Sequence, residues 1–201
     1  GVRDVGRVGW VLEDFMKHPN VAKAQLKRPH VIALRFYTTV AFWRINQSLK
    51  SEVRTKHPLP FTVHFIWEGA KLLRRVAAEH PNMPTVLWRG VKNVSIDRTF
   101  KERGGTHFSP MSTTSDLDVA IKYGTCNAGS LIFKIDASTA LRHGADLEWL
   151  SAFASEKEEL FPPLTFLQPS KDVNGRTREQ TVTSSITGAS VTVVELVPDL
   201  S

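Results

Sequence analysis

The stretch from Ser151 to Pro163 reads SAFASEKEELFPP and contains two glutamates, Glu156 and Glu158, that are two positions apart. Where a chain is extended, side chains two residues apart point to the same face. Carboxylates on one face raise each other's pKa, which separates an acid from a base as chemistry at a glycosidic bond requires. A charged, solvated loop is the alternative interpretation of this run.

Two segments upstream carry further polar groups that suit a phosphate-bearing ligand. In LWRG (87–90), Arg89 ends an apolar run, and its guanidinium can bind a diphosphate through two parallel hydrogen bonds. Gly90 then lets a ligand approach the backbone closely. In MSTT (111–114), consecutive hydroxyls can hold a carboxylate or a ribose. Taken singly, each segment also fits a surface cation or a threonine-rich strand.

The chain around these segments changes its pattern near Pro84. Before it, apolar residues recur at helical spacing over 8–16, 32–43 and 63–77, and prolines separate the runs. After it, short β-rich runs are broken by turn residues, and Asp116 is placed to cap a short helix. Helices followed by many short strands indicate an α+β fold with a β-sandwich. The expected strands are 85–88, 106–112, 130–135, 147–153, 159–161, 165–168 and 190–197.

The composition fits one domain of an ordinary globular protein. The chain has 201 residues, 41% of them apolar, and a formal net charge of +6, which favours anionic partners such as nucleic acid, a membrane or a phosphate-bearing cofactor. Cys126 is the only cysteine, which fits a reducing compartment or a cysteine-poor secreted toxin. No apolar run approaches the ~20 residues that cross a bilayer. Because the sequence begins at Gly1 without a signal-peptide pattern, we expect a processed or excised piece.

The three polar segments, taken in order, resemble the ADP-ribosyltransferases of the Arg-Ser-Glu type. That family, which includes the vertebrate-type arginine transferases and many bacterial toxins, has an aromatic-Arg-Gly strand, a Ser-Thr-Ser strand, and an aromatic residue three positions before Glu-x-Glu. The stretches DLDVAIKYG (116–124) and ELFPP (159–163) are similar to the family pattern as well. The resemblance covers residues 84 to 198, and residues 1 to 80 resemble the helical N-terminal portion in general character.

The resemblance implies a fold and an activity. The fold would be the α+β ADP-ribosyltransferase fold, in which N-terminal helices (1–83) precede a two-sheet β-sandwich core (84–201) with an NAD cleft. The whole chain, 1–201, would be a single catalytic domain. The activity would be cleavage of NAD, here a substrate, and transfer of its ADP-ribose to an arginine side chain of a target protein, with release of nicotinamide.

The resemblance also implies roles for residues that would bind NAD. Arg89 would bind the phosphates, and the backbone of Gly90 would bind the nicotinamide carboxamide. Ser112 would hold the catalytic glutamate and the ribose on the nicotinamide side, and Thr113 would join this NAD-binding set. Glu158 would be the catalytic glutamate, hydrogen-bonded to the ribose 2′-hydroxyl.

Three further residues would act on the acceptor side or beside the nicotinamide. Glu156 would face the incoming substrate, Phe153 matches the aromatic residue of the substrate-recognition loop, and Tyr123 would stack near the nicotinamide. Two positions depart from the family pattern. Thr114 stands where Ser is commoner and keeps the hydroxyl, whereas Glu159 replaces an apolar residue and adds a third carboxylate whose direction the sequence leaves open.

Two alternatives remain at this stage. One is an NAD glycohydrolase on the same fold, with water as the acceptor, and the other is a catalytically inactive module that binds NAD or nucleic acid through its basic helices.

No metal is expected, because the seven histidines are scattered without ligand spacing. The expected partners are NAD and a protein target, with automodification as a further outcome. Neither a membrane nor nucleic acid is expected as a partner. The expected location is a reducing, NAD-containing compartment such as the cytoplasm, which a secreted effector could also reach.

Overall fold

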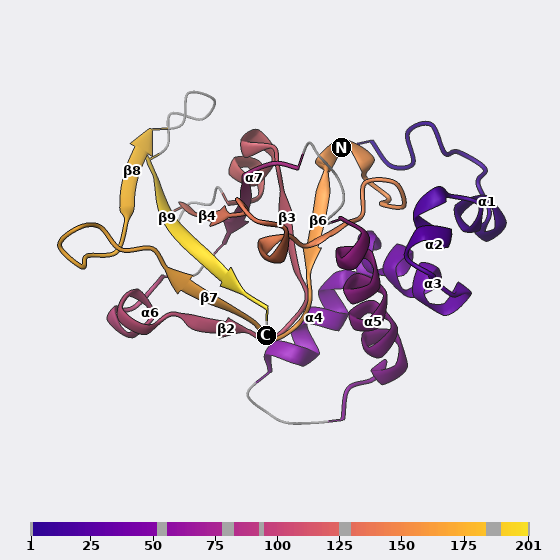
Figure 1. Ribbon diagram of the computed structural model, residues 1–201, viewed down its shortest axis with the longest axis horizontal. Coiled ribbons are helices and arrows are strands. Elements are labelled where there is room, and N and C mark those ends of the chain that lie inside the picture. The colour runs from indigo at the N-terminus through magenta and orange to yellow at the C-terminus, as the bar shows by residue number, and fades with distance from the viewer. Residues whose placement is uncertain are drawn as a thin grey trace. The chain divides into compact units, whose positions relative to one another are not determined.

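A computed structural model describes residues 2–51, 56–77, 83–92, 95–124, 130–183 and 190–200 (Figure 1). The chain forms two compact units. The first consists of Gly1–Asn82, Phe108–Ser112 and His143–Leu164, and the second of Met83–His107, Thr113–Arg142 and Thr165–Ser201. The N-terminal helices, indigo to purple in Figure 1, all belong to the first unit.

Five α-helices are described in the first unit, and prolines begin three of them. Pro19, Pro29 and Pro60 lie in the first turns of α2, α3 and α5, where the missing N–H costs no hydrogen bond. Pro19 therefore begins a new helix as well as ending the run before it. The helices are α1 (Leu12–Met16), α2 (Pro19–Lys23), α3 (Arg28–Phe36), α4 (Phe42–Lys50) and α5 (Pro60–Ala77), and a π-helical turn (Tyr37–Ala41) joins α3 to α4.

Helices α3 and α5 pack against each other and form the core of the first unit. One buried cluster contains fully buried residues of both helices, Val31 and Leu34 of α3 and Ile66 and Ala70 of α5. Gly69 permits the close approach, because a Cβ there would lie 2.9 Å from Leu34 Cδ1. None of the helices in the described part of the chain is long and apolar enough to cross a membrane.

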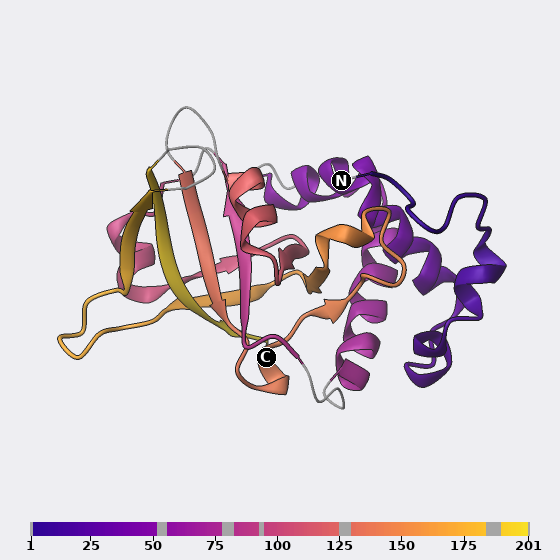
Figure 2. The same ribbon diagram turned by 90° about the horizontal axis from the view of Figure 1, so that it is seen from above.

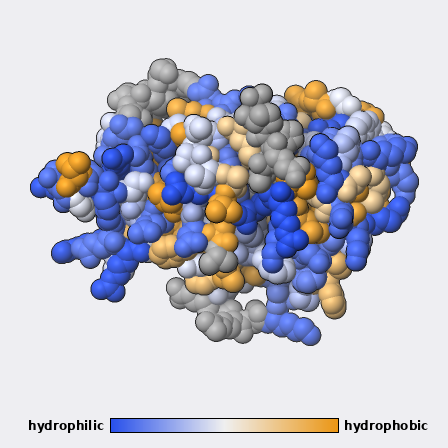
Figure 3. Space-filling view, in the orientation of Figure 1, coloured by the Kyte–Doolittle hydropathy of each residue, from blue (hydrophilic) through white to orange (hydrophobic). Residues whose placement is uncertain are grey.

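The apolar repeat that predicts a helix over 32–43 lies on the exposed face. Ile32, Phe36, Val40 and Trp43 are 44–84% exposed. Helix α3 carries a second apolar face, and α5 covers that one instead. The helix is also interrupted by the π-helical turn, where Thr39 leaves the helical region with φ −94° and ψ −177°. The hydropathy surface shows hydrophobic residues scattered among hydrophilic ones (Figure 3).

Short strands complete the first unit. Strands β5 (Ala145–Asp146) and β6 (Glu158–Phe161) are antiparallel, and β6 neighbours β3 (Met111–Thr114). The expected strand over 147–153 is wrong, because this stretch folds as turns. The amides of Leu150 and Ser151 both bond to the carbonyl of Leu147, at 3.0 and 2.7 Å, which leaves no extended ladder.

The second unit is built on a mixed sheet. Its strands are ordered β2-β7-β9-β4-β1-β3, with β8 paired to β9, and only the β4–β9 pair is parallel among those whose register is described. The elements are β1 (Val86–Val91), α6 (Arg98–Arg103), β2 (Gly105–His107), α7 (Leu117–Gly124), β4 (Ser130–Asp136), β7 (Thr165–Pro169), β8 (Glu179–Thr183) and β9 (Ser190–Asp199).

Helices α6 and α7 cover opposite faces of this sheet (Figure 2). Phe100 of α6 stacks on Phe133 of β4 at 6.0 Å between ring centroids, while Ile121 of α7 packs with Ile132. Because successive side chains of a strand point to opposite faces, the two helices lie on either side of β4.

The α+β class, with helices before strands, is confirmed. Most expected strands are present, but the one over 106–112 is divided into β2 and β3 by the segment that contains Pro110, and α6 and β8 are additional. The described strands form one open hydrogen-bonded path where two sheets are expected.

Candidate functional site

Glu158 is the first residue of β6 and is tied to the turns before it. Its carbonyl accepts a hydrogen bond from the Leu147 amide at 2.9 Å. Its carboxylate Oε2 lies 3.4 Å from Ser151 Oγ, which donates to it. The same hydroxyl accepts a hydrogen bond from the Phe153 amide at 3.1 Å. Ser151 therefore links the expected catalytic glutamate to the expected acceptor-side aromatic residue, a role that its position in the sequence does not reveal.

Glu156 ends a short 3-10 helix (Ala154–Glu156) that begins directly after Phe153. The Glu156 amide donates to the Phe153 carbonyl at 2.9 Å. Lys157 then adopts the left-handed conformation, with φ 46° and ψ 52°. The chain from Glu156 to Glu158 is thus turned rather than extended, so the expectation that alternation alone places both carboxylates on one face is wrong. Both side chains are half-buried.

Ser112 lies on β3, next to the strand that begins with Glu158. Strands β3 and β6 are hydrogen-bonded neighbours in the sheet. Met111 is fully buried and Ser112 is half-buried, as alternation along a strand requires. Four of the expected site residues belong to the first unit: Ser112, Phe153, Glu156 and Glu158.

The second unit contains Arg89, Gly90, Thr113 and Tyr123. Arg89 and Gly90 lie on β1, opposite Phe133 and Ile132 of β4, and Arg89 is half-buried. Tyr123 is on α7, which packs against β1, and 46% of it is exposed.

Gly90 has a packing role that the sequence attributes to a ligand. A Cβ at this position would lie 2.1 Å from the Ala120 carbonyl oxygen and 2.3 Å from the Gly124 amide nitrogen. Both atoms belong to the backbone of α7, which cannot move aside without displacing the helix. The close approach that requires glycine is therefore that of α7.

The hydroxyl segment and the helix after it are joined by a cap. Thr113 and Thr114 are buried, and Thr114 Oγ1 accepts the Asp116 amide at 3.0 Å. Asp116 Oδ1 in turn accepts the Asp118 and Val119 amides at 3.0 and 3.4 Å, so the expected N-cap is confirmed. Threonine in place of serine at 114 retains the hydroxyl that this turn uses.

The direction of the third carboxylate is now clear. Glu159 is buried, and its Oε2 accepts the Gly144 amide at 3.2 Å and lies 3.1 Å from His143 Nδ1. It follows Glu158 on an extended strand and therefore points to the opposite face. The carbonyl of His143 accepts a hydrogen bond from Arg74 Nε at 2.8 Å, and burial lowers the pKa of Arg74. Glu159 thus supports the fold on the side away from Glu158.

Two further features of the described ranges are the distribution of metal-ligand side chains and a surface hollow. Among these residues no three His, Cys, Asp or Glu side chains gather as metal ligands would, and Cys126 lies outside them. A hollow of about 520 Å³ between α6 and residues 171–179 contains none of the expected site residues. Four of its charged residues form the Arg98–Glu102 and Lys101–Glu179 ion pairs, at 2.6 and 2.7 Å.

Solved structures and a family model both match the chain. HopU1 of Pseudomonas syringae pv. tomato DC3000 has the same fold, with a TM-score of 0.62 and 18% sequence identity over 96% of this chain and 90% of that one. Exoenzyme S of Pseudomonas aeruginosa, in complex with human 14-3-3 protein beta and carba-NAD, matches with a TM-score of 0.58 and 16% identity over 96% of this chain and 84% of that one. The C3 exoenzyme of Clostridium limosum matches with a TM-score of 0.60 and 17% identity over 94% of this chain and 95% of that one. No curated protein sequence matches the chain. The sequence model of the family described as NAD:arginine ADP-ribosyltransferase matches residues 13–187. The chain therefore belongs to the NAD:arginine ADP-ribosyltransferase family.

Proposed function

We propose that this protein cleaves NAD and transfers the ADP-ribose to arginine side chains of target proteins. Membership in the family supports NAD-dependent ADP-ribosylation. The observation that carries the arginine proposal is the turn from Phe153 to Glu158, where a second carboxylate, Glu156, ends a 3-10 helix two residues before the glutamate that Ser151 holds.

In this proposal Glu158 stabilises the transition state of NAD cleavage. Nicotinamide leaves as a neutral molecule because the electron pair of the C1′–N bond neutralises its pyridinium ring. The ribose then carries positive charge, and a fixed carboxylate near C1′ and the 2′-hydroxyl stabilises that charge. Ser112 would orient Glu158 and the ribose, and Thr113 would support this strand.

Three further residues would bind the rest of NAD. The Arg89 guanidinium would bind the diphosphate, which its planar fork fits. The backbone of Gly90 would bind the nicotinamide carboxamide, and Tyr123 would stack near the nicotinamide ring. NAD is a substrate in this reaction, and the proposal assigns no step to a metal.

Glu156 and Phe153 would select the acceptor. Arginine has a pKa above ~12, so its guanidinium is a poor nucleophile until a base removes a proton. A carboxylate at Glu156 would attract the guanidinium, orient one nitrogen towards C1′ and accept the proton as the new N–C1′ bond forms. Phe153 would pack against the incoming side chain.

Labelled NAD tests this proposal directly. The chain is incubated with NAD labelled in its adenosine part and with agmatine, and ADP-ribosyl-agmatine is separated from free ADP-ribose. We expect wild type to form the agmatine product, and Glu158→Gln to lose at least about 100-fold in the rate of NAD cleavage, because one preorganised electrostatic contact is removed. Free ADP-ribose as the sole product would instead identify a glycohydrolase, and near-normal turnover of Glu158→Gln would reject its assignment.

We further propose that the target is a protein of another cell. Several proteins of the same fold are named as toxins or effectors, including the C2-toxin component of Clostridium botulinum and the type III effector XopAI of Xanthomonas axonopodis. The reaction needs a compartment that contains NAD, such as the cytoplasm. Mass spectrometry after incubation with NAD and a cell lysate would reveal the modified residues of targets and of the chain itself. We expect the modified residues to be arginines.

A further inference from the structure

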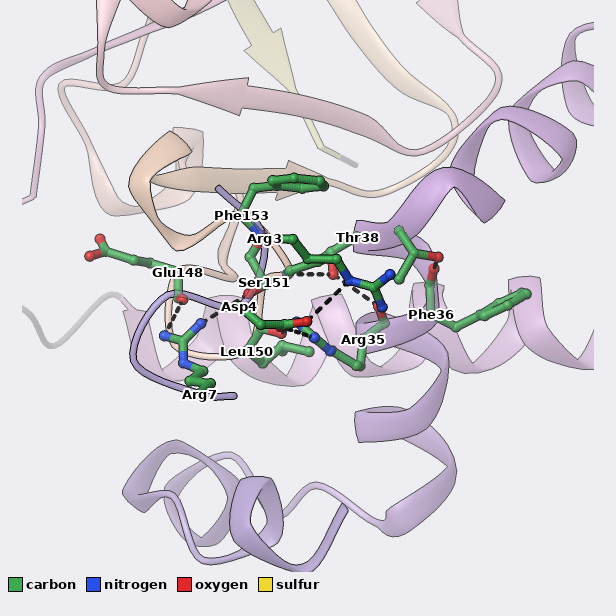
Figure 4. A network of polar contacts seen from close by, with 12 residues as sticks. Arg3, Asp4, Arg7, Arg35, Phe36, Thr38, Glu148, Leu150, Ser151 and Phe153 are labelled. Carbon is green, nitrogen blue, oxygen red and sulfur yellow. Dashed lines mark hydrogen bonds and ion pairs between the residues drawn. The ribbon is translucent and has the colours of Figure 1, made fainter. Parts of the chain in front are cut away.

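The loop that leads to the Phe153–Glu158 turn is held by arginines from distant parts of the chain. Arg7 donates from Nη1 to the Ser151 carbonyl at 2.9 Å and from Nη2 to the Glu148 carbonyl at 2.8 Å. Arg35 of α3 donates from Nη1 to the Leu150 carbonyl at 2.9 Å. In Figure 4 both guanidinium groups point at the backbone of this loop.

Asp4 completes the arrangement, and we call Asp4, Arg7 and Arg35 the clamp. The Asp4 amide donates to the Ala152 carbonyl at 2.8 Å, and the Asp4 carboxylate pairs with Arg35. Burial alone would raise the pKa of Asp4, but the hydrogen bonds and charges of Arg35 and Arg3 lower it. Four carbonyls between residues 148 and 152 are thus bonded to the clamp.

The last loop residue that the clamp holds, Ala152, directly precedes the acceptor-side turn. The Ala152 amide donates to Thr38 Oγ1 at 3.0 Å, so both peptide groups of Ala152 are fixed. Phe153 follows at once, and its carbonyl accepts the Glu156 amide that closes the 3-10 helix. The position of Glu156 therefore depends on a peptide that the clamp holds.

Glu158 has a separate anchor. It belongs to β6, which pairs with β5, and its carbonyl accepts the Leu147 amide. Loosening the clamp would free the beginning of the turn, with Phe153 and Glu156. The backbone of Glu158 stays on its strand, and its carboxylate would lose only the long 3.4 Å hydrogen bond from Ser151 Oγ. Loss of the clamp should therefore affect the acceptor more than NAD cleavage.

We propose that Arg7, with Arg35 and Asp4, is a positioning residue that fixes Phe153 and Glu156 for transfer to the acceptor. This role rests on the proposed transferase function and deepens it. It gives Asp4 and Arg7, which bond to the loop backbone and to Arg35, a part in choosing the guanidinium over water.

The test compares Arg7→Gln with Arg28→Gln in the full chain. Arg28 forms an exposed ion pair with Glu13 at 2.7 Å, so its substitution removes the same charge from the first unit without touching the loop. We expect Arg7→Gln to lower kcat for transfer to agmatine about tenfold more than kcat for NAD hydrolysis, because a small displacement of a positioned group suffices for such a loss. Arg28→Gln should keep the wild-type ratio of the two activities, and the KM for NAD should be alike in both variants.

Amide hydrogen exchange gives a second readout that does not need turnover. Peptides covering residues 151–157 should exchange faster in Arg7→Gln than in Arg28→Gln, while peptides of β6 exchange alike. Arg7→Lys keeps the charge but replaces the fork by one nitrogen, so it should lie between wild type and Arg7→Gln in both measurements. If Arg7→Gln fails to fold, Arg7→Lys replaces it in the comparison with Arg28→Gln.

The outcomes separate the two proposals. If wild type transfers ADP-ribose and the Arg7 variants keep the wild-type ratio and exchange pattern, the positioning role is wrong and the transferase function stands. If wild type cleaves no NAD or modifies no agmatine, the proposed function fails and the positioning role fails with it.

Discussion

Two neighbouring carboxylates, Glu158 and Glu159, have opposite surroundings because they alternate along β6. Glu158 is half-buried and bonded to a hydroxyl, whereas Glu159 is 7% exposed and bonded to the Gly144 amide beside His143. The family motif predicts the role of Glu158, but nothing in the local sequence indicates that Glu159 is a buried core residue. Its partners are 15 and 16 positions away, and only the pairing of β5 with β6 brings them together.

Glu159→Leu tests this structural role. Removing the acceptor of a buried amide costs about 1–3 kcal/mol, so we expect the free energy of unfolding in urea to fall by that amount. Glu102→Gln is the matched control, because its ion pair with Arg98 lies on the surface and contributes little. An equal effect of the two substitutions would show that Glu159 does not support the fold.

Ser151 and the clamp show why part of the candidate site escapes prediction from sequence. Arg89, Gly90, Ser112 and Glu158 belong to a motif with fixed residue types. The clamp bonds to main-chain carbonyls, which every residue possesses. The side chains of the loop therefore do not indicate where the clamp binds. Arg7 and Arg35 look like any other cation of a basic helical surface until the fold brings them within 2.9 Å of those carbonyls.

At the scale of elements, local signals predict those parts whose conformation is decided locally. Asp116 caps α7 as expected, and the apolar runs of β1, β4 and β9 form central strands. Helix α6 is missed because four of its six residues are charged and Phe100 alone gives no apolar repeat, although Asp97 accepts the Phe100 amide at its N-terminus. The turns over 147–153 replace an expected strand because contacts with the N-terminal helices override local preference.

The contact between α7 and β1 gives a prediction at this scale. Gly90→Ala would push a methyl group into the backbone of α7, and such overpacking costs about 1–3 kcal/mol. We expect a lower free energy of unfolding together with weaker NAD binding, measured by urea denaturation and by calorimetry. Unchanged stability with weaker NAD binding would show that Gly90 serves the ligand and not the helix.

At the scale of the whole molecule, the net charge of +6 is compatible with many paired carboxylates. Glu195 of β9 illustrates this, since Lys134 lies opposite it on β4 and donates to it at 2.8 Å. That hydrogen bond and the charges of Lys134 and Arg178 lower the pKa of Glu195 despite its partial burial. Asp4 and Asp136 also have lowered pKa values. In each case the folded state binds the proton more weakly than the unfolded state.

These directions predict how stability changes with pH. A carboxylate whose folded pKa is lowered contributes stability above its unfolded pKa, about 4, and this contribution is lost as pH falls through the folded pKa. We expect the free energy of unfolding of wild type to decline from about pH 5 to pH 3. The difference between wild type and Glu195→Gln should shrink over the same range, and a difference that grows towards low pH would contradict the assignment.

The roles of Glu156 and Glu158 are separated by comparing two products in Glu156→Gln and wild type. With labelled NAD and agmatine, the rates of ADP-ribosyl-agmatine and of free ADP-ribose formation are measured in the same sample. We expect Glu156→Gln to abolish transfer to agmatine and to retain NAD hydrolysis, since Glu156 serves the acceptor and Glu158 serves the cleavage. Equal loss of both activities would contradict it.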